Sequence, residues 1–194
     1  ALPIGSRESF VSSLSLGFIG AGRMATALAQ GCVSANLADG DAVVASDPSD
    51  AARQAFAAAV AGAQTTDTNA DVLSGATTIF LAVKPQKMDE ALATLREAVE
   101  PRHLLISIAA GVTLSRLANA LPAGTRLIRV MPNTPCLIGL GASAFARGDA
   151  ANDDDARLVA MLLGAVGDVD EVAEDQLDAV TGLSGSGPAF IYTA

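Results

Sequence analysis

Ten residues near the start of the chain, Leu16-Gly17-Phe18-Ile19-Gly20-Ala21-Gly22-Arg23-Met24-Ala25, combine an apolar run, a glycine-rich turn and the beginning of an amphipathic segment. The apolar run predicts a buried strand over residues 14–19, and the amphipathic segment predicts a helix over residues 23–35. Between them lies the pattern G-x-G-x-x-A. Its first glycine permits a tight turn, its second lets a phosphate approach the backbone, and the final alanine allows close helix–strand packing. The stretch therefore predicts a dinucleotide-binding loop at a helix N-terminus.

The rest of the chain continues to alternate short apolar runs with longer Ala- and Leu-rich amphipathic segments. Strands are expected at residues 42–46, 77–83 (counted as the fourth strand), 104–108 and 126–131, and helices at 49–61, 87–99 and 113–120. Strands that alternate with helices form parallel sheets with right-handed crossovers. The predicted fold is therefore α/β, a Rossmann-type, doubly wound, mostly parallel sheet with helices on both faces.

The pattern changes after residue 131. Residues 131–135 are expected to form a rigid loop, because their two prolines fix φ and lack an N–H group. We expect an added edge strand at 139–147, a helix from Asn152 to about residue 163, a last strand at 166–172, and a helix at 174–181 that leads into a Ser- and Gly-rich loop. The apolar run that Pro188 opens stops without a helix cap. The domains expected are a tail at 1–13, a dinucleotide-binding domain at 14–183 and the start of a truncated helical domain at 184–194.

The composition is that of an acidic, largely apolar protein, with 194 residues, 51% of them hydrophobic, and a formal net charge of −9. This charge argues against nucleic acid or an anionic membrane as the main partner, and no apolar run approaches the roughly 20 residues that span a bilayer. Cys32 and Cys136 lack metal-ligand spacing and are expected to be reduced thiols of a cytoplasmic protein. No metal site is predicted, and the acidic run at 152–155 is interpreted as a helix start. His103 is expected at a strand entry, where a structural role is favoured over catalysis.

Candidate ligand-binding residues lie at the ends of the expected strands, because ligands of such sheets bind beyond the carboxyl ends of the strands. Ser46, helped by Arg53, suits the 2′-phosphate of NADP, whereas Asp47 suits either the ribose hydroxyls of NAD or a turn. Lys84 could be a general acid, a phosphate contact or only a solvated lysine. The small or rigid residues at 107–111 and 131–135 leave room for a flat nicotinamide ring.

Five ordered motifs resemble those of the pyrroline-5-carboxylate reductases. They are residues 16–25, Ala82-Val83-Lys84-Pro85-Gln86, Ser107-Ile108-Ala109-Ala110-Gly111-Val112, Arg129-Val130-Met131-Pro132-Asn133-Thr134-Pro135, and residues 178–190. The first motif occurs in many dehydrogenases, whereas the last two are much more specific. The resemblance implies reduction of 1-pyrroline-5-carboxylate to proline, the last step of proline biosynthesis, by hydride transfer from NAD(P)H to the C=N carbon.

The resemblance also implies two sets of site residues. The cofactor contacts that carry over are Ile19, Gly20, Ala21, Gly22, Arg23, Met24, Ser46, Asn69, Val83, Lys84, Pro85, Ala109, Ala110 and Asn133. A loop beside the substrate carries over to Ser184, Gly185, Ser186, Gly187 and Pro188. NADP(H) is the preferred cofactor because of Ser46 and Asn69, and NAD(H) stays open because of Asp47.

Residues 1–194 show no obvious proton donor and no clamp for the substrate carboxylate. The resemblance implies that both come from beyond Ala194, in a C-terminal all-helical domain that also forms a homodimer or higher oligomer. The chain alone is then expected to bind cofactor with little or no turnover. Two alternatives stay open: a β-hydroxyacid-dehydrogenase-like oxidoreductase, which the absence of any lysine after Lys87 disfavours, and a non-catalytic dinucleotide-binding module.

Overall fold

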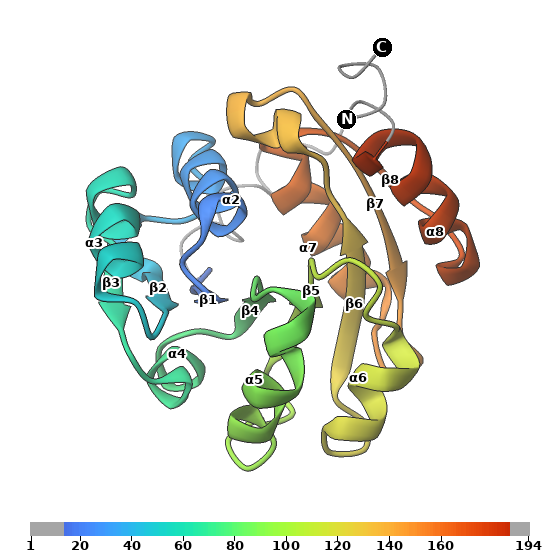
Figure 1. The fold of residues 1–194 in the computed structure, drawn as a ribbon, viewed down its shortest axis with the longest axis horizontal. Coiled ribbons are helices and arrows are strands. Elements are labelled where there is room, and N and C mark those ends of the chain that lie inside the picture. Colours follow the sequence, from blue (N-terminus) through green and yellow to red (C-terminus); the bar gives the residue numbers. More distant parts are fainter. Residues whose placement is uncertain (1–13, 187–194) are drawn as a thin grey trace.

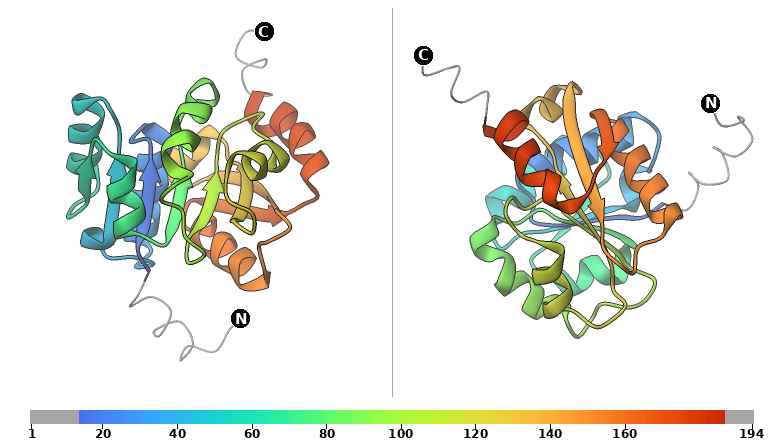
Figure 2. Two further views of the ribbon diagram at one scale, coloured as in Figure 1. Left: turned by 90° about the horizontal axis from the view of Figure 1, so that it is seen from below. Right: turned by 90° about the vertical axis from the view of Figure 1, so that its right-hand side faces the viewer.

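The computed structural model describes residues 14–186, in which one twisted sheet lies between two layers of helices (Figures 1 and 2). The strands follow the order β3-β2-β1-β4-β5-β6-β7-β8 across the sheet. Every neighbouring pair is parallel except β6 and β7. The strands are β1 (Leu16–Ile19), β2 (Val43–Ser46), β3 (Gln64–Thr66), β4 (Thr78–Leu81), β5 (Leu104–Ser107), β6 (Arg126–Met131), β7 (Gly141–Arg147) and β8 (Gly167–Glu171). The doubly wound, mostly parallel sheet of the Rossmann type is confirmed.

The helices divide between the two faces of the sheet, and Figure 1 shows α2 on one side of β1 and α4 and α5 on the other. Helices α2, α3 and α7 contribute to one hydrophobic cluster, and α4, α5, α6 and α8 contribute to the other. Their bounds are α2 (Arg23–Ser34), α3 (Asp50–Ala59), α4 (Asn69–Gly75), α5 (Met88–Leu95), α6 (Leu114–Ala120), α7 (Asp153–Gly164) and α8 (Leu177–Val180). Within residues 14–186 no helix is both long and apolar enough to span a membrane.

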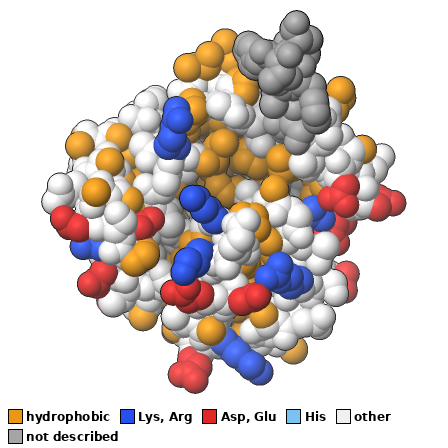
Figure 3. All heavy atoms as spheres, in the orientation of Figure 1, with side chains coloured by type: hydrophobic (Ala, Val, Ile, Leu, Met, Phe, Trp, Pro, Cys, Tyr) orange, Lys and Arg blue, Asp and Glu red, His pale blue; other side chains and the backbone are white. Residues whose placement is uncertain are grey.

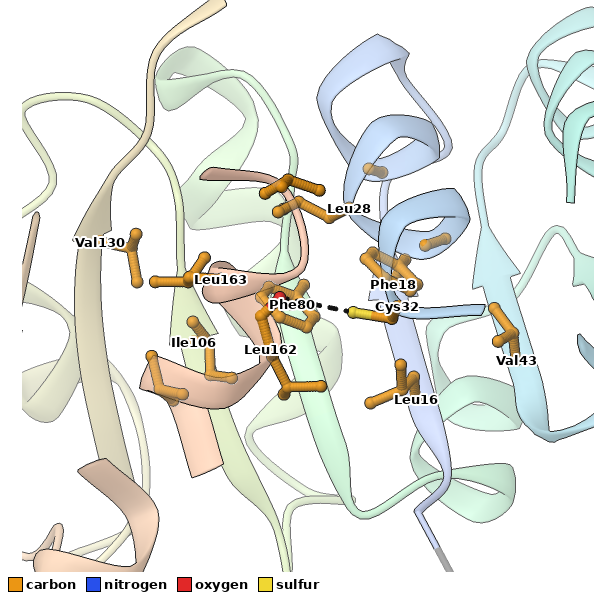
Figure 4. Packing of buried hydrophobic residues seen from close by; sticks show 14 of the residues in the cluster. Leu16, Phe18, Leu28, Cys32, Val43, Phe80, Ile106, Val130, Leu162 and Leu163 are labelled. Carbon is orange, nitrogen blue, oxygen red and sulfur yellow. Dashed lines mark hydrogen bonds between the residues drawn. The ribbon is translucent and has the colours of Figure 1, made fainter. Parts of the chain in front are cut away.

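Aromatic and sulfur-containing side chains form the centre of the first cluster, part of which Figure 4 shows. Phe18 on β1 stacks on Phe80 on β4 with the ring centroids 5.0 Å apart, and its ring centroid lies 5.7 Å from that of Phe56 on α3. Complete burial of one such side chain contributes about 1.5–3 kcal/mol. Cys32 lies in the same cluster, with its Sγ 3.7 Å from the carbonyl oxygen of Leu162. This burial raises the pKa of the Cys32 thiol to about 12, so the group is an inert part of the core.

His103 lies immediately before β5, at the strand entry where it was expected. Its Nδ1 accepts a hydrogen bond from the backbone N–H of Glu100, and its Nε2 lies 2.9 Å from the carbonyl oxygen of Leu73. With Nδ1 as the acceptor, Nε2 carries the proton and donates it, so the ring is neutral. Burial is the main cause that lowers the pKa of His103. The structural role favoured for His103 is therefore confirmed, since both ring nitrogens serve to join α4 to the loop before β5.

The segment after β6 differs from the expected edge strand. The short helix η3 (Thr134–Ile138) turns the chain back, so β7 is antiparallel to β6 and β8 pairs with its other side. β7 is thus an interior strand, and residues 143–146 are buried because both of its faces are covered: Phe145 packs in one hydrophobic cluster, and Ala144 and Ala146 pack in the other. The last strand and the acidic helix start are confirmed. Asn152 and Asp155 form a reciprocal capping box at the N-terminus of α7.

Two further segments were not anticipated. The sequence pattern assigned no residues to the third strand, which the structure shows to be β3. The helix α4, which lies between β3 and β4, was not predicted either. The sequence predicted a Ser- and Gly-rich loop from Ser184 onward. This prediction is wrong for residues 184–186, because residues 181–186 continue α8 as a π-helix. The hydroxyls of Thr181 and Ser184 donate to the carbonyls of Leu177 and Val180, which gives this segment bonds that a loop would lack. The expectations for residues 1–13 and 187–194, including Gly187 and Pro188, lie outside the described residues.

Candidate dinucleotide-binding site

The carboxyl ends of the parallel strands meet at one edge of the sheet. In register, Ile19 pairs with both Ser46 and Leu81, and Leu81 pairs with Ser107, so the segments that follow β1, β2, β4 and β5 begin side by side. Figure 3 shows a hollow on this face, between α2 and the β6–β7 pair, with hydrophobic side chains within it and Lys and Arg side chains at its border. The sheet thus brings most of the sequence-predicted cofactor residues to one edge.

The glycine loop between β1 and α2 has the shape that its sequence predicts. Gly20 has φ of 100°, its N–H donates to the carbonyl of Ser46 over 2.7 Å, and a Cβ at this position would lie 2.9 Å from the carbonyl oxygen of Ala82. Gly22 caps α2 and is different, because a Cβ there would have no heavy atom within 4 Å. Gly20 therefore serves the turn, while Gly22 keeps the helix N-terminus open. That opening fits the pyrophosphate of a dinucleotide.

Asp47, at the end of β2, holds this loop in place. One of its carboxylate oxygens accepts from the N–H of Ala21 at 3.0 Å, and the other accepts from the N–H of Ser49 at 2.9 Å. Arg53 folds back onto the same turn, where it donates to the Asp47 carbonyl at 2.7 Å and pairs with Asp50 at 3.1 Å. The turn-forming interpretation of Asp47 is thus the one that the geometry supports, and it places a guanidinium beside the strand end.

Ser46 and Asn69 contact each other, although 23 positions separate them. The Ser46 side chain is buried, and its hydroxyl donates to the Asn69 side-chain oxygen at 2.7 Å. The Asn69 amide donates in turn to the hydroxyl of Thr94 on α5 at 2.8 Å, and that hydroxyl donates to the Ala91 carbonyl. This chain of bonds joins β2, α4 and α5. Ser46 therefore orients the Asn69 side chain, and its hydroxyl proton is already used in the hydrogen bond to Asn69.

The remaining predicted residues lie at the ends of β4, β5 and β6. Lys84 is exposed and precedes the short helix η2 (Pro85–Lys87). Ala109 is buried and Ala110 exposed in the turn after β5, where neither side chain extends past Cβ. Asn133 accepts the N–H of Ala142 on its side-chain oxygen at 2.9 Å, which fixes the loop after β6 against β7. These strand ends form a wall of small side chains, and Lys84 is the exposed cation at the end of β4.

One part of the predicted site, the loop at residues 184–188, is not brought to this wall by described side chains. Ser184 donates to the backbone of its own helix, and nothing is described of the side chains at 185–188. Among the described residues, no three His, Cys, Asp or Glu side chains gather in a group that could hold a metal ion. The sequence reasoning gave no role to Arg129, a buried arginine in the middle of the apolar strand β6. Its position inside an apolar run is the signal that could have singled it out.

A first strand that leads through an open glycine loop into a helix, in a doubly wound parallel sheet, defines a Rossmann-type dinucleotide-binding domain. A family model described as "NADP oxidoreductase coenzyme F420-dependent" matches residues 15–111. Pyrroline-5-carboxylate reductase 3 of Bos taurus is 46% identical over 176 residues, which are 91% of this chain and 56% of the relative. The pyrroline-5-carboxylate reductase of Coxiella burnetii has a TM-score of 0.86 at 31% identity, covering 93% of this chain and 67% of that one. This chain belongs to the pyrroline-5-carboxylate reductase family.

A third relative bears on the cofactor. The pyrroline carboxylate reductase of Plasmodium falciparum, solved with NADP bound, has a TM-score of 0.82 at 29% identity, covering 93% of this chain and 66% of that one. The chain therefore spans little more than half of the Bos taurus relative and about two thirds of the two solved relatives. The resemblance drawn from the five motifs is confirmed.

Proposed function

We propose that the complete protein reduces 1-pyrroline-5-carboxylate to proline with NAD(P)H, and that the chain described here supplies its nucleotide-binding half. The observation that carries this proposal is the open glycine loop at the carboxyl edge of the sheet, in a chain of this reductase family. A bound nicotinamide cofactor supplies the hydride for the C=N carbon. The residues of the chain bind and orient: residues 20–24 receive the phosphates, and Val83, Pro85, Ala109, Ala110 and Asn133 border a flat ring.

The imine accepts a hydride more easily when its nitrogen is protonated, so the complete site needs a proton source and contacts for the substrate carboxylate. Among the predicted site residues whose side chains are described, Lys84 is the one amine at the ends of the strands. We infer that Lys84 contacts the cofactor or the substrate carboxylate, and that the proton donor lies in the part of the family's fold beyond residues 14–186. A helical C-terminal domain, a homodimer or higher oligomer and a cytoplasmic location belong to the same proposal.

NADPH is proposed as the preferred cofactor, with NADH as a possible substitute. The Asp47 carboxylate already accepts from two backbone N–H groups, so it is poorly placed to accept from both ribose hydroxyls of NADH. The Arg53 guanidinium lies at the same turn, where it can reach a 2′-phosphate. Charge-assisted bonds of this kind contribute about 1.5–3 kcal/mol, or roughly ten- to a hundredfold in affinity.

The activity is tested by following NADPH and then NADH oxidation with 1-pyrroline-5-carboxylate, using the complete protein and the 194-residue chain in parallel. We expect turnover by the complete protein and cofactor binding with little or no turnover by the chain. A complete protein that leaves the imine unreduced with both cofactors would contradict the proposed reaction. Proline formation by the chain at the rate of the complete protein would contradict the placement of the proton donor.

The cofactor preference is tested by Arg53→Gln, with Arg157→Gln on α7 as a matched control. Both arginines pair with an aspartate three positions earlier, but Arg157 lies on α7, which follows the antiparallel strand β7 and so begins at the opposite edge of the sheet. Arg53→Gln is expected to weaken NADPH binding about tenfold and to change NADH binding by less than about twofold. Equal losses for both cofactors would show that Arg53 only shapes the turn.

A further inference from the structure

Arg129 is a charged side chain in a place where strands carry apolar residues. It lies on β6 between Ser107 of β5 and Ala146 of β7, and only 5% of the residue is exposed. A buried guanidinium is costly unless carboxylates and hydrogen bonds compensate it. Packing alone does not account for an arginine at this position, so its partners must explain it.

Both partners come from one short segment at the far end of the described chain. The guanidinium donates to Glu174 at 3.1 Å and to Asp178 at 3.0 Å. These carboxylates are four positions apart, so they lie on the same side of the segment that begins with η4 (Glu174–Gln176) and continues as α8. Arg129 thus fixes the direction in which α8 leaves the sheet. We call Arg129, Glu174 and Asp178 the α8 latch.

The latch also reaches the segment that follows β5. The Glu174 oxygen that binds Arg129 accepts the backbone N–H of Leu114, the first residue of α6, at 2.7 Å. Arg129 itself lies four positions before Asn133, in the strand that leads to the loop of residues 131–135. One buried cation therefore links the exits of β5 and β6 to the helix that carries residues 181–186. Figure 1 shows α8 beside β7 and β8, at the same end of the sheet as these loops.

We propose that Arg129 is a positioning residue, which holds α8 so that the segment 181–186 stands at the carboxyl edge of the sheet, on the substrate side. This inference rests on the proposed reduction of the imine. Arg129 touches neither substrate nor cofactor in this scheme, and it acts through Glu174 and Asp178. A displacement of about 1 Å in a positioning group can lower the rate by up to about a hundredfold. A small shift of Glu174 and Asp178, at the start of this short helix, would therefore change what residues 181–186 contact.

Asp178→Asn is the sharpest test, because it removes the charge from one of the two partners of Arg129 and leaves the buried guanidinium paired with Glu174. Asp154→Asn on α7 is the matched control, since Asp154 has a similarly exposed carboxylate that is paired with an arginine. Steady-state kinetics of the complete protein are measured by varying the imine and NADPH separately. Asp178→Asn is expected to raise the KM of the imine, or lower kcat, about tenfold, while the NADPH KM changes less than about twofold. Asp154→Asn is expected to change neither.

A conservative variant and a measurement without substrate complete the test. Arg129→Lys keeps the charge but cannot bridge two carboxylates as a planar guanidinium does, so it is expected to show the same selective defect as Asp178→Asn. Hydrogen exchange of the backbone at residues 177–186 is expected to accelerate at least about tenfold in Asp178→Asn and to stay unchanged in Asp154→Asn.

Two kinds of failure are distinguishable. Unchanged imine kinetics in Asp178→Asn, or an equal loss in Asp154→Asn, would overturn the positioning role. A wild-type protein that does not reduce the imine would overturn the proposed function instead. In that case the exchange data still decide whether the latch holds α8, and unchanged exchange in Asp178→Asn would overturn the latch itself.

Discussion

Replacement of Gly22 by alanine is expected to weaken cofactor binding by about ten- to a hundredfold without unfolding the protein. Gly22 has φ of −78° and ψ of 179°, which any residue adopts, and a Cβ there meets no heavy atom within 4 Å. Less freedom in the unfolded chain favours alanine by about 0.4–1 kcal/mol. The weaker N-cap that alanine provides costs a similar amount, about 0.5–1 kcal/mol. The two effects nearly cancel, so the free energy of unfolding should change by less than about 1 kcal/mol.

The added methyl group nevertheless occupies the space through which a pyrophosphate reaches the helix N-terminus. Loss of one or two hydrogen bonds to a charged group costs about 1.5–3 kcal/mol. This corresponds to a roughly ten- to hundredfold weaker affinity for NADPH. The predicted signature is thus a large change in affinity with almost no change in stability.

Calorimetric titration with NADPH and thermal unfolding of the same samples measure the two quantities. Gly164→Ala, at the end of α7 in open space, is the control for adding a methyl group, and it should bind NADPH normally. Gly20→Ala should show the opposite signature, because φ of 100° and a Cβ 2.9 Å from the Ala82 carbonyl oxygen make alanine strained there. We expect Gly20→Ala to lose about 1–3 kcal/mol of stability. Wild-type NADPH affinity in Gly22→Ala would refute the placement of the phosphates at this loop.

Three further outcomes follow from buried groups. Cys32 should resist alkylation at pH 8 in the folded protein and react after unfolding, because burial raises its pKa to about 12. Mass spectrometry measures the labelling, and rapid labelling of the folded protein would contradict the burial of Cys32. His103 has a folded pKa below its unfolded value of about 6.5, so its contribution to stability is present above that pH and declines as the pH falls through the folded pKa. Denaturant midpoints at several pH values should show this decline, and His103→Gln should lack it. Asp155→Asn weakens both the cap of α7 and the ion pair with Arg126. Chemical denaturation should show that the free energy of unfolding falls by about 2–3 kcal/mol. A decrease below about 0.5 kcal/mol, as at ordinary surface positions, would contradict these roles.

Most of the parallel half of the fold could be predicted because each of its signals is local. A glycine that needs positive φ, an apolar strand and an amphipathic helix are each encoded by neighbouring residues, as at residues 16–25. β3 escaped prediction because three residues, Gln64-Thr65-Thr66, are too few and too polar to show a pattern. They become a strand only because β2 offers them an unpaired edge.

The sequence by itself determined the glycine loop, the alternation of strands and helices along most of the chain and the family of the chain, since each of these signals is carried by residues close together in the chain. Only the tertiary structure decided which long-range partners each polar group has. The Asp47 carboxylate turned out to hold the N–H of Ala21, 26 positions away, and Arg129 turned out to bind Asp178, 49 positions away. Such pairs depend on how strands and helices pack in three dimensions, and the pattern of neighbouring residues does not encode that distance.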